Sequence, residues 1–212
     1  AMGGREVGGL ANMLACHLGF SEGERADVAA FWQAPRLCTG PGLKAVDLFR
    51  AVHDGHVKFL WVMATNPAVS MPDAGFVREA LALCEMVVVS DVIADTDTAR
   101  LAQVRLPAMA WGEKEGTVTN SERRVSRQRA LFPAPGEARA DWAIIAQVAK
   151  RMGFAGFDWA NAAGVFREYA AQRLAREAVL RLREGHRARR LPGDRRTDEV
   201  LAEEYAEARW PA

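Results

Sequence analysis

The sequence predicts an α/β fold in which a parallel sheet lies between helices in three layers. Two short, continuous apolar runs, at residues 59–64 and 86–89, have the pattern of strands that are buried on both faces. A helical pattern with short connections lies between them, and strand, helix and strand in this order favour a right-handed parallel unit. With 212 residues, half of them apolar, the chain is long enough to bury a core.

The elements before the first strand are helical. Four glycines lie among the first nine residues, and a helical stretch is expected at residues 10–18. A turn at residues 40–42 separates this stretch from a regular amphipathic pattern. Ala45, Leu48, Phe49 and Val52 recur at helical spacing in that pattern, and Gly55 supplies a stop.

The helix between the two strands begins near Asp73, which follows Pro72 and precedes apolar residues at helical spacing. After the second strand, either Asp95 or Thr96 is expected to begin a short helix. A third strand is predicted at residues 104–108. A charged residue such as Arg105 is unusual in that strand if the strand is central in the sheet.

The C-terminal half is predicted to hold a long loop and then helices. The loop covers residues 111–124, and Asp141 is expected to cap a helix whose apolar face includes Ile145 and Met152. From about residue 161 the chain is rich in Ala, Leu, Arg and Glu, which favour helix, and a last short helix is expected at residues 198–209. We therefore divide the chain into an α/β domain at 1–160 and a helical tail at 161–212.

Composition excludes several classes of protein. The formal charge of +1 gives no global attraction to nucleic acid or membranes, and no apolar run reaches the roughly 20 residues that cross a bilayer. The N-terminus has no export pattern, so a cytoplasmic location is expected. Cys16, Cys38 and Cys84 are widely spaced and form no C-x-x-C pair, which indicates reduced thiols, at least two of them buried. With four scattered histidines, they predict no metal site in this chain alone.

Polar residues follow the predicted strands, where open parallel sheets bind ligands. Asn66 follows the first strand, Ser90 and Asp91 follow the second, Lys114 lies in the loop after the third, and Asp141 begins a helix. An aspartate can accept from a guanine edge or ribose, a lysine can neutralise phosphate, and Asn or Ser can orient either group. A nucleotide-like ligand is therefore expected. The plainer alternative is that these residues only cap turns and helices or lie in solvent.

Several longer motifs carry a resemblance to a known family. They are GGREVGGLAN at residues 3–12, MATNPAVSMPD at 63–73, VVSD at 88–91, WGEKEGTVTNSERR at 111–124 and PGEARADW at 135–142. Together they resemble the prokaryotic assimilatory nitrate reductases of the molybdopterin oxidoreductase family. The resemblance covers residues 1 to about 170, and these motifs are far more specific than a glycine pattern. No G-x-G-x-x-G motif follows either strong strand, which disfavours an ordinary NAD site.

The resemblance implies a function and a set of contacts. The family carries molybdenum on two molybdopterin guanine dinucleotides, has a [4Fe–4S] cluster near its N-terminus, and reduces nitrate to nitrite. Asn66, Ser90, Asp91, Lys114 and Asp141 match family positions that contact the dinucleotide, whereas Arg5 and Glu6 match a segment near the cofactor. No catalytic residue or metal ligand is expected here.

The chain also departs from the family pattern. The cluster-binding cysteines, the C-terminal cofactor-binding domain and the residues that ligate the metal are absent. We therefore expect a fragment that is inactive alone and that binds neither the molybdenum cofactor nor the [4Fe–4S] cluster by itself. Its expected partners are the remaining domains of the parent enzyme and an electron donor. Gln103 and Arg105 interrupt a family strand that is otherwise apolar, which predicts partial exposure of the third strand.

The arginine-rich tail allows two interpretations. Its arginines could bind nucleic acid electrostatically, but Glu177 and Glu184 interrupt the series, and an apolar face favours packing against the domain or a second copy. We expect no nucleic-acid partner. A non-catalytic interaction domain, and the same domain of a formate dehydrogenase, remain the alternative functions.

Overall fold

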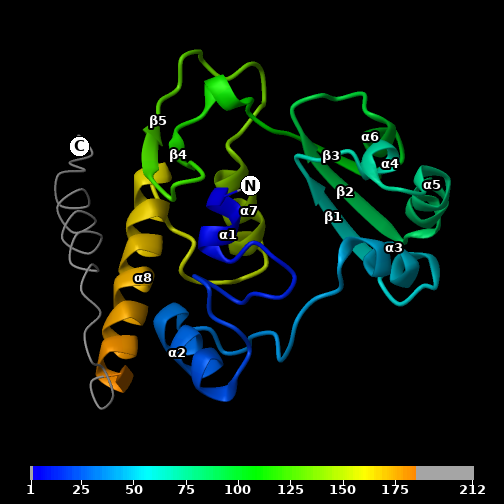
Figure 1. Ribbon diagram of the computed structural model, residues 1–212. Helices are drawn as coiled ribbons and strands as arrows, with labels where there is room; N and C mark the ends of the chain where they lie inside the picture. The colour runs from blue at the N-terminus through cyan, green and yellow to red at the C-terminus, as the bar shows by residue number, and fades with distance from the viewer. Residues whose placement is uncertain (1, 185–212) are drawn as a thin grey trace. The chain divides into compact units, whose positions relative to one another are not determined.

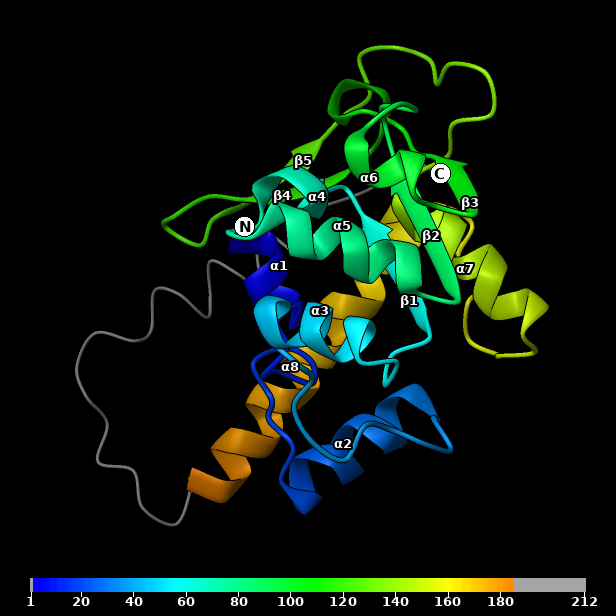
Figure 2. The ribbon, with the colours of Figure 1, turned by 90° about the vertical axis from the view of Figure 1, so that its right-hand side faces the viewer.

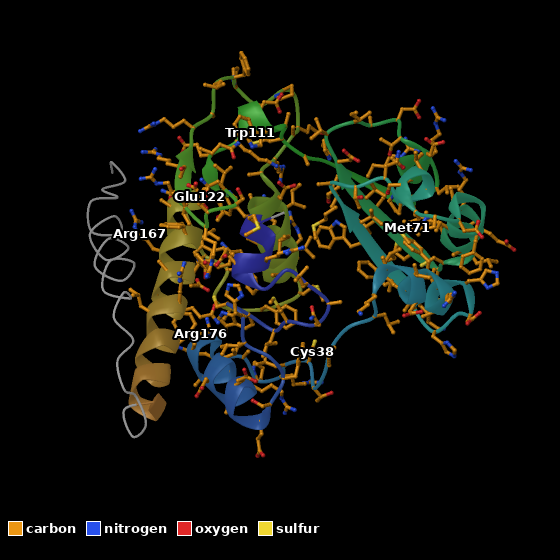
Figure 3. All side chains as sticks on the ribbon, in the orientation of Figure 1. Cys38, Met71, Trp111, Glu122, Arg167 and Arg176 are labelled. Atoms are coloured by element: carbon orange, nitrogen blue, oxygen red, sulfur yellow. The ribbon has the colours of Figure 1, made fainter. Side chains whose placement is uncertain are left out.

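A computed structural model describes residues 2–184 and divides the chain into two compact units at the boundary between Asp158 and Trp159. The first unit contains the three-stranded sheet. The second unit contains one long helix, α8 (Ala162–Glu184), and the indole N–H of Trp159, which precedes this helix, donates to Glu168 at 2.6 Å. Figure 3 labels Arg167 and Arg176 on this helix. The helix expected at residues 198–209 lies outside the described residues.

The first unit is built on a three-stranded parallel sheet (Figure 1). Its strands are β1 (Phe59–Met63), β2 (Met86–Asp91) and β3 (Val104–Pro107), in the order β1-β2-β3. In the register, Phe59 lies opposite Met86 and Val88 opposite Val104. The predicted parallel pairing of the two apolar runs is therefore confirmed, and the third strand forms where it was expected.

Four helices gather over one face of the sheet, as Figure 2 shows in the foreground. They are α3 (Ala45–His53), α4 (Pro67–Ser70), α5 (Ala74–Leu83) and α6 (Asp97–Arg100). The Asp73 side chain accepts from the Phe76 backbone N–H at 3.0 Å and so caps α5. Thr96, rather than Asp95, caps α6 by accepting from the N–H of Ala99.

The core lies between these helices and the sheet. Leu60 and Val62 of β1, Val87 and Val89 of β2 and Leu81 of α5 are all buried there. Burying these aliphatic side chains supplies the main force that holds the helices on the sheet, at roughly 1.5–3 kcal/mol for each fully buried side chain.

The opposite face of β1 is not buried by the part of the chain that the structure describes. Phe59 and Met63 are 56% and 41% exposed, whereas Leu60 and Val62 between them are buried. The expectation that this run is buried on both faces is therefore wrong for the described residues. All four covering helices lie on one face, and a continuous apolar run cannot show whether a second layer is present.

The N-terminal segment differs from its prediction. Helices form at α1 (Met2–Val7) and α2 (Glu22–Trp32), and a capping box of Ser21 with Glu24 begins α2. The helix expected at residues 10–18 is wrong, because this stretch is a series of turns. Cys16 and His17 are both left-handed there, with φ of 46° and 65°. Two consecutive left-handed residues cannot belong to a right-handed helix.

The expected loop at 111–124 contains regular structure. A short 3₁₀ turn, η1 (Trp111–Glu113), precedes an antiparallel hairpin of β4 (Gly116–Thr119) and β5 (Val125–Gln128). Figure 3 labels Trp111 on that turn and Glu122 at the tip of the hairpin. The hairpin was missed because its strands are four residues long and polar, so they lack the apolar alternation that predicts a strand.

Helix α7 (Asp141–Arg151) forms where it was expected, but only part of the predicted face is buried. Ala149 of that face is buried, as are Ile144 and Ala146, whereas Ile145 and Met152 of that face are 37% and 68% exposed. Its N-cap is Ala140, not Asp141. No helix among residues 2–184 is long and apolar enough to cross a membrane.

Candidate functional site

Two of the five candidate residues, Ser90 and Asp91, are the last residues of β2, and the other three follow the ends of strands along the chain. Asn66 follows β1 by three residues, after Ala64, whose left-handed backbone (φ 53°) turns the chain away from the sheet. The Asn66 amide oxygen accepts from both the backbone N–H and the hydroxyl of Thr98, at 3.2 and 2.7 Å. This oxygen is therefore held in place. The amide nitrogen donates no hydrogen bond within residues 2–184, so it can donate one to a ligand.

Thr98 is the residue that positions Asn66, and sequence reasoning missed it. It is completely buried, and its hydroxyl also accepts from the backbone N–H of Ala68. Thr98 therefore joins α6 to the start of α4 through three hydrogen bonds. An isolated threonine in a short helix gave no indication of this role in the sequence.

Ser90 lies at the end of β2 but is only 1% exposed. Its hydroxyl oxygen accepts from the Trp61 indole N–H at 2.7 Å, across the β1–β2 pair. The hydroxyl proton is still available for donation. Ser90 therefore ties the ends of the two strands together, and the structure gives it a packing role in addition to the binding role expected of it.

Asp91 is half-buried and caps the turn that follows β2. Its Oδ1 atom accepts from the backbone N–H groups of Val92 and Ile93, at 2.7 and 3.4 Å. The capping role that we weighed against ligand binding is therefore present. The other carboxylate oxygen, Oδ2, accepts no hydrogen bond from the residues that the structure describes, so one side of the carboxylate remains available.

Lys114 and Asp141, which are 27 positions apart in the chain, form an ion pair. The Lys114 ammonium lies 2.6 Å from Asp141 Oδ2, and the two side chains are 27% and 33% exposed. A parallel bridge between Ala108 and Arg139 brings the start of α7 beside the end of β3, and so brings these two residues together. The N-cap of α7, Ala140, makes no side-chain hydrogen bond to the first backbone N–H groups of the helix.

The candidate residues thus form two groups at one edge of the sheet. Asn66, Ser90 and Asp91 end the first two strands, and the Lys114–Asp141 pair lies beyond the third. Within residues 2–184, no hydrogen bond or ion pair joins a residue of one group to a residue of the other. Acceptors, an amide and an ammonium at one edge suit a polar ligand with an anionic part.

A second polar network, which sequence reasoning missed, joins α1 to the hairpin. Glu6 is only 4% exposed, and Arg123 donates to both of its carboxylate oxygens at 2.8 and 3.0 Å. His17 lies 3.0 Å from Oε2 of the same carboxylate. Hydrogen bonding from Arg123 lowers the pKa of Glu6 to about 2. Burial opposes this, and His17 adds to the lowering.

The described residues hold no group of three or more His, Cys, Asp or Glu side chains placed to bind a metal. Cys16 and Cys84 are buried and Cys38 is exposed, so at least two of the three thiols are buried, as expected.

Comparisons with known proteins place these residues in a family. Residues 3–151 match the molybdopterin oxidoreductase family. A nitrate reductase from Klebsiella oxytoca is 59% identical over 172 residues, which are 81% of this chain and 20% of that protein. The F420-dependent formate dehydrogenase subunit alpha of Methanocaldococcus jannaschii is 44% identical over 114 residues, 53% of this chain and 17% of that protein.

Among solved structures, acetylene hydratase from Pelobacter acetylenicus has a similar fold. The TM-score is 0.54 at 22% identity, over 63% of this chain and 19% of that protein. The chain spans about a fifth of the length of the curated relatives it matches. Because the family match covers most of the chain and includes every strand of the sheet, the chain belongs to the molybdopterin oxidoreductase family.

Proposed function

We propose that this chain is part of a molybdenum-dependent nitrate reductase and contacts the guanine dinucleotide arm of its molybdopterin cofactor. The observation that carries the proposal is the 59% identity to a nitrate reductase across a segment that includes all five candidate residues. The whole enzyme would reduce nitrate to nitrite, and this segment would supply part of the wall of the cofactor site.

The arrangement of the candidate residues supports a division of roles. The free oxygen of Asp91 would accept from the guanine edge or from ribose hydroxyls, and the amide nitrogen of Asn66 would donate to the same part of the ligand. Lys114 would neutralise phosphate, and Asp141 would hold the lysine in place through the 2.6 Å contact. Ser90 would keep the strand ends aligned, and its hydroxyl would donate a hydrogen bond to the ligand.

The bound cofactor supplies the redox chemistry, which the side chains of this segment do not provide. Their contribution is to bind and orient the nucleotide end. The proposal places the [4Fe–4S] cluster, the metal ligands and the electron donor's docking site in other parts of a cytoplasmic parent enzyme. By itself, the 212-residue chain should therefore neither reduce nitrate nor retain stoichiometric molybdenum or iron.

A formate dehydrogenase is the second candidate, because the Methanocaldococcus jannaschii relative is 44% identical over 114 residues. Contacts to a shared cofactor do not define the substrate. Nitrate is favoured because the nitrate reductase matches more of the chain at higher identity. An assay of the parent enzyme with reduced viologen and nitrate, run beside formate oxidation, separates the two candidates.

Calorimetry of the 212-residue chain with guanosine diphosphate tests the site. We expect measurable binding that is weakened in Asp91→Ala and in Lys114→Ala. Asp54→Ala is the matched control, because Asp54 is exposed, lies at the end of α3 and takes no part in the site. Absence of binding, or equal weakening in Asp54→Ala, would contradict the proposed contacts.

The rival proposal is a non-catalytic interaction domain whose helical tail docks a second copy. It requires an oligomer that disappears when residues 161–212 are deleted. Size-exclusion chromatography of both chains measures this directly. A monomer at both lengths would remove the rival, and a tail-dependent oligomer without nucleotide binding would favour it.

A further inference from the structure

A cavity of about 380 Å³ lies between β3 and helix α7, and none of the five residues assigned to the cofactor lines it. Three arginines line it: Arg105 from the strand, Arg139 from the segment before α7 and Arg151 from the end of that helix. Its apolar part is formed by Leu106, Pro107, Ile144 and Val148. The volume is within the range of sites that bind small molecules, roughly 300–1,000 Å³.

The charge around this cavity is unbalanced. Glu137 is the one acidic side chain in its lining, against three guanidinium groups. Among residues 2–184, none of the three arginines forms an ion pair with a carboxylate. Arg100 and, to a smaller extent, Arg105 lower the pKa of Asp95. The Asp95 carboxylate is already paired with Arg100 through both of its oxygens, so it does not serve as the counter-ion of Arg105. Like charges that converge without counter-ions repel one another, so the arrangement favours an anion between them.

Two of the arginines are held in place by one glutamine. Arg139 donates from Nη1 to the side-chain oxygen of Gln147, and Arg151 donates from Nη1 to its backbone oxygen at 3.4 Å. Each guanidinium has five N–H donors, so these bonds leave most of their donors available. Donors that are already oriented lose less conformational entropy when a ligand binds.

Arg105 alone has a simpler explanation, because a charged residue on an edge strand discourages pairing with another chain. That explanation covers neither Arg139 nor Arg151, which come from outside the strand and line the same cavity.

We propose that this cavity is a second binding site, distinct from the cofactor contacts, for a small oxyanion with two or more negative charges. Guanidinium forks recognise both phosphate and carboxylate groups in pairs of hydrogen bonds.

Calorimetry at physiological ionic strength tests this site with two probes, inorganic pyrophosphate for phosphate chemistry and citrate for carboxylate chemistry. Binding of either probe by the 212-residue chain, weakened about tenfold or more in Arg105→Gln and in Arg151→Gln, is the expected result. Both arginines are exposed, so these variants should fold, and a matching circular dichroism spectrum checks this. The probe that binds identifies the chemistry of the natural ligand.

Two controls make the result specific. Arg50→Gln removes an exposed arginine that is paired with Asp47 on α3, outside the cavity, and should leave the affinity unchanged. Arg78→Gln should also leave it unchanged, because Arg78 is an exposed arginine that is paired with Asp97 and does not line the cavity. The proposal is overturned if neither probe binds. It is also overturned if either control loses as much affinity as the cavity variants, because binding would then reflect general charge, or if the cavity variants lose no affinity, because the probe would then bind elsewhere.

Discussion

Replacing Glu6 by glutamine should destabilise the first unit more than an ordinary ion-pair variant does. The Glu6 carboxylate is 4% exposed and is held by two hydrogen bonds from Arg123 and one contact with His17. Glutamine has a similar shape but removes the negative charge and one of the acceptors. It therefore leaves the guanidinium facing a neutral amide at a buried position.

The size of the effect follows from the pKa of Glu6. Lowering that pKa from 4.5 to about 2 corresponds to about 3 kcal/mol in favour of the charged folded state. The Arg123 side chain is 56% exposed, so solvent screens part of this interaction, and we expect a loss of about 2 kcal/mol at pH 7.

The pH dependence has a definite sign. Because the pKa of Glu6 is depressed in the folded state, its contribution to stability is complete above pH 4.5 and is lost as the pH falls towards 2. The difference in the free energy of unfolding between the parent chain and Glu6→Gln should therefore fall, by about pH 3, to less than half of its value at pH 7.

Urea denaturation of both chains between pH 7 and pH 3 measures the difference. Glu85→Gln is the matched control, since Glu85 forms an exposed ion pair with Lys58, and its denaturation midpoint should not move. The double variant Glu6→Gln with Arg123→Gln should lose less than the sum of the two single losses. An unchanged midpoint in Glu6→Gln, strictly additive losses, or a difference that grows on acidification would refute the reasoning.

Three further predictions concern stability and use the same denaturation assay. Gly8→Ala should lower the free energy of unfolding by more than about 2 kcal/mol, because Gly8 has a φ of +95° and an added Cβ would lie 2.7 Å from the Ala15 backbone. Gly55→Ala should cost less, because Gly55 also has a positive φ but an added Cβ there would meet open space. Thr98→Val should cost about 1–3 kcal/mol, because it removes one of the two hydrogen bonds to the Asn66 amide oxygen and leaves the Ala68 backbone N–H without its acceptor. Recovery of stability in Thr98→Ser would assign the loss to the hydroxyl. Leu81→Ala should cost about 2–5 kcal/mol because Leu81 is completely buried, and a loss below 1 kcal/mol would contradict the proposed core.

Local patterns predicted the parallel sheet and three of the four helices that cover it, namely α3, α5 and α6, whereas α4 begins at Pro67 in a stretch that the sequence indicated to be a turn. The two apolar runs became β1 and β2, and Asp73 caps α5 as its position before Phe76 suggested. The exposure predicted for the third strand is also observed, since Val104, Arg105 and Pro107 are exposed at the edge of the sheet. These features depend on residues that are close in the chain, and their spacing is visible in the sequence.

The candidate site was predicted only in part. The rule that ligands bind at the carboxyl ends of parallel strands selected Asn66, Ser90, Asp91, Lys114 and Asp141, and all five lie at that edge. The sequence could not show that Lys114 and Asp141 pair with each other, or that Ser90 is buried against Trp61. Their assignment to a nucleotide remains a prediction.

The sequence by itself determined the order of the three sheet strands, the helices α5 and α6 between them, and the family to which the chain belongs. The tertiary structure decided which face of the sheet is covered, which polar groups are already paired, and where arginines from separate elements meet. Glu6 and Arg123 are 117 positions apart, yet two hydrogen bonds join their side chains and lower the pKa of Glu6 to about 2. Such contacts join distant segments through the packing of the whole unit, and no local period in the sequence encodes them.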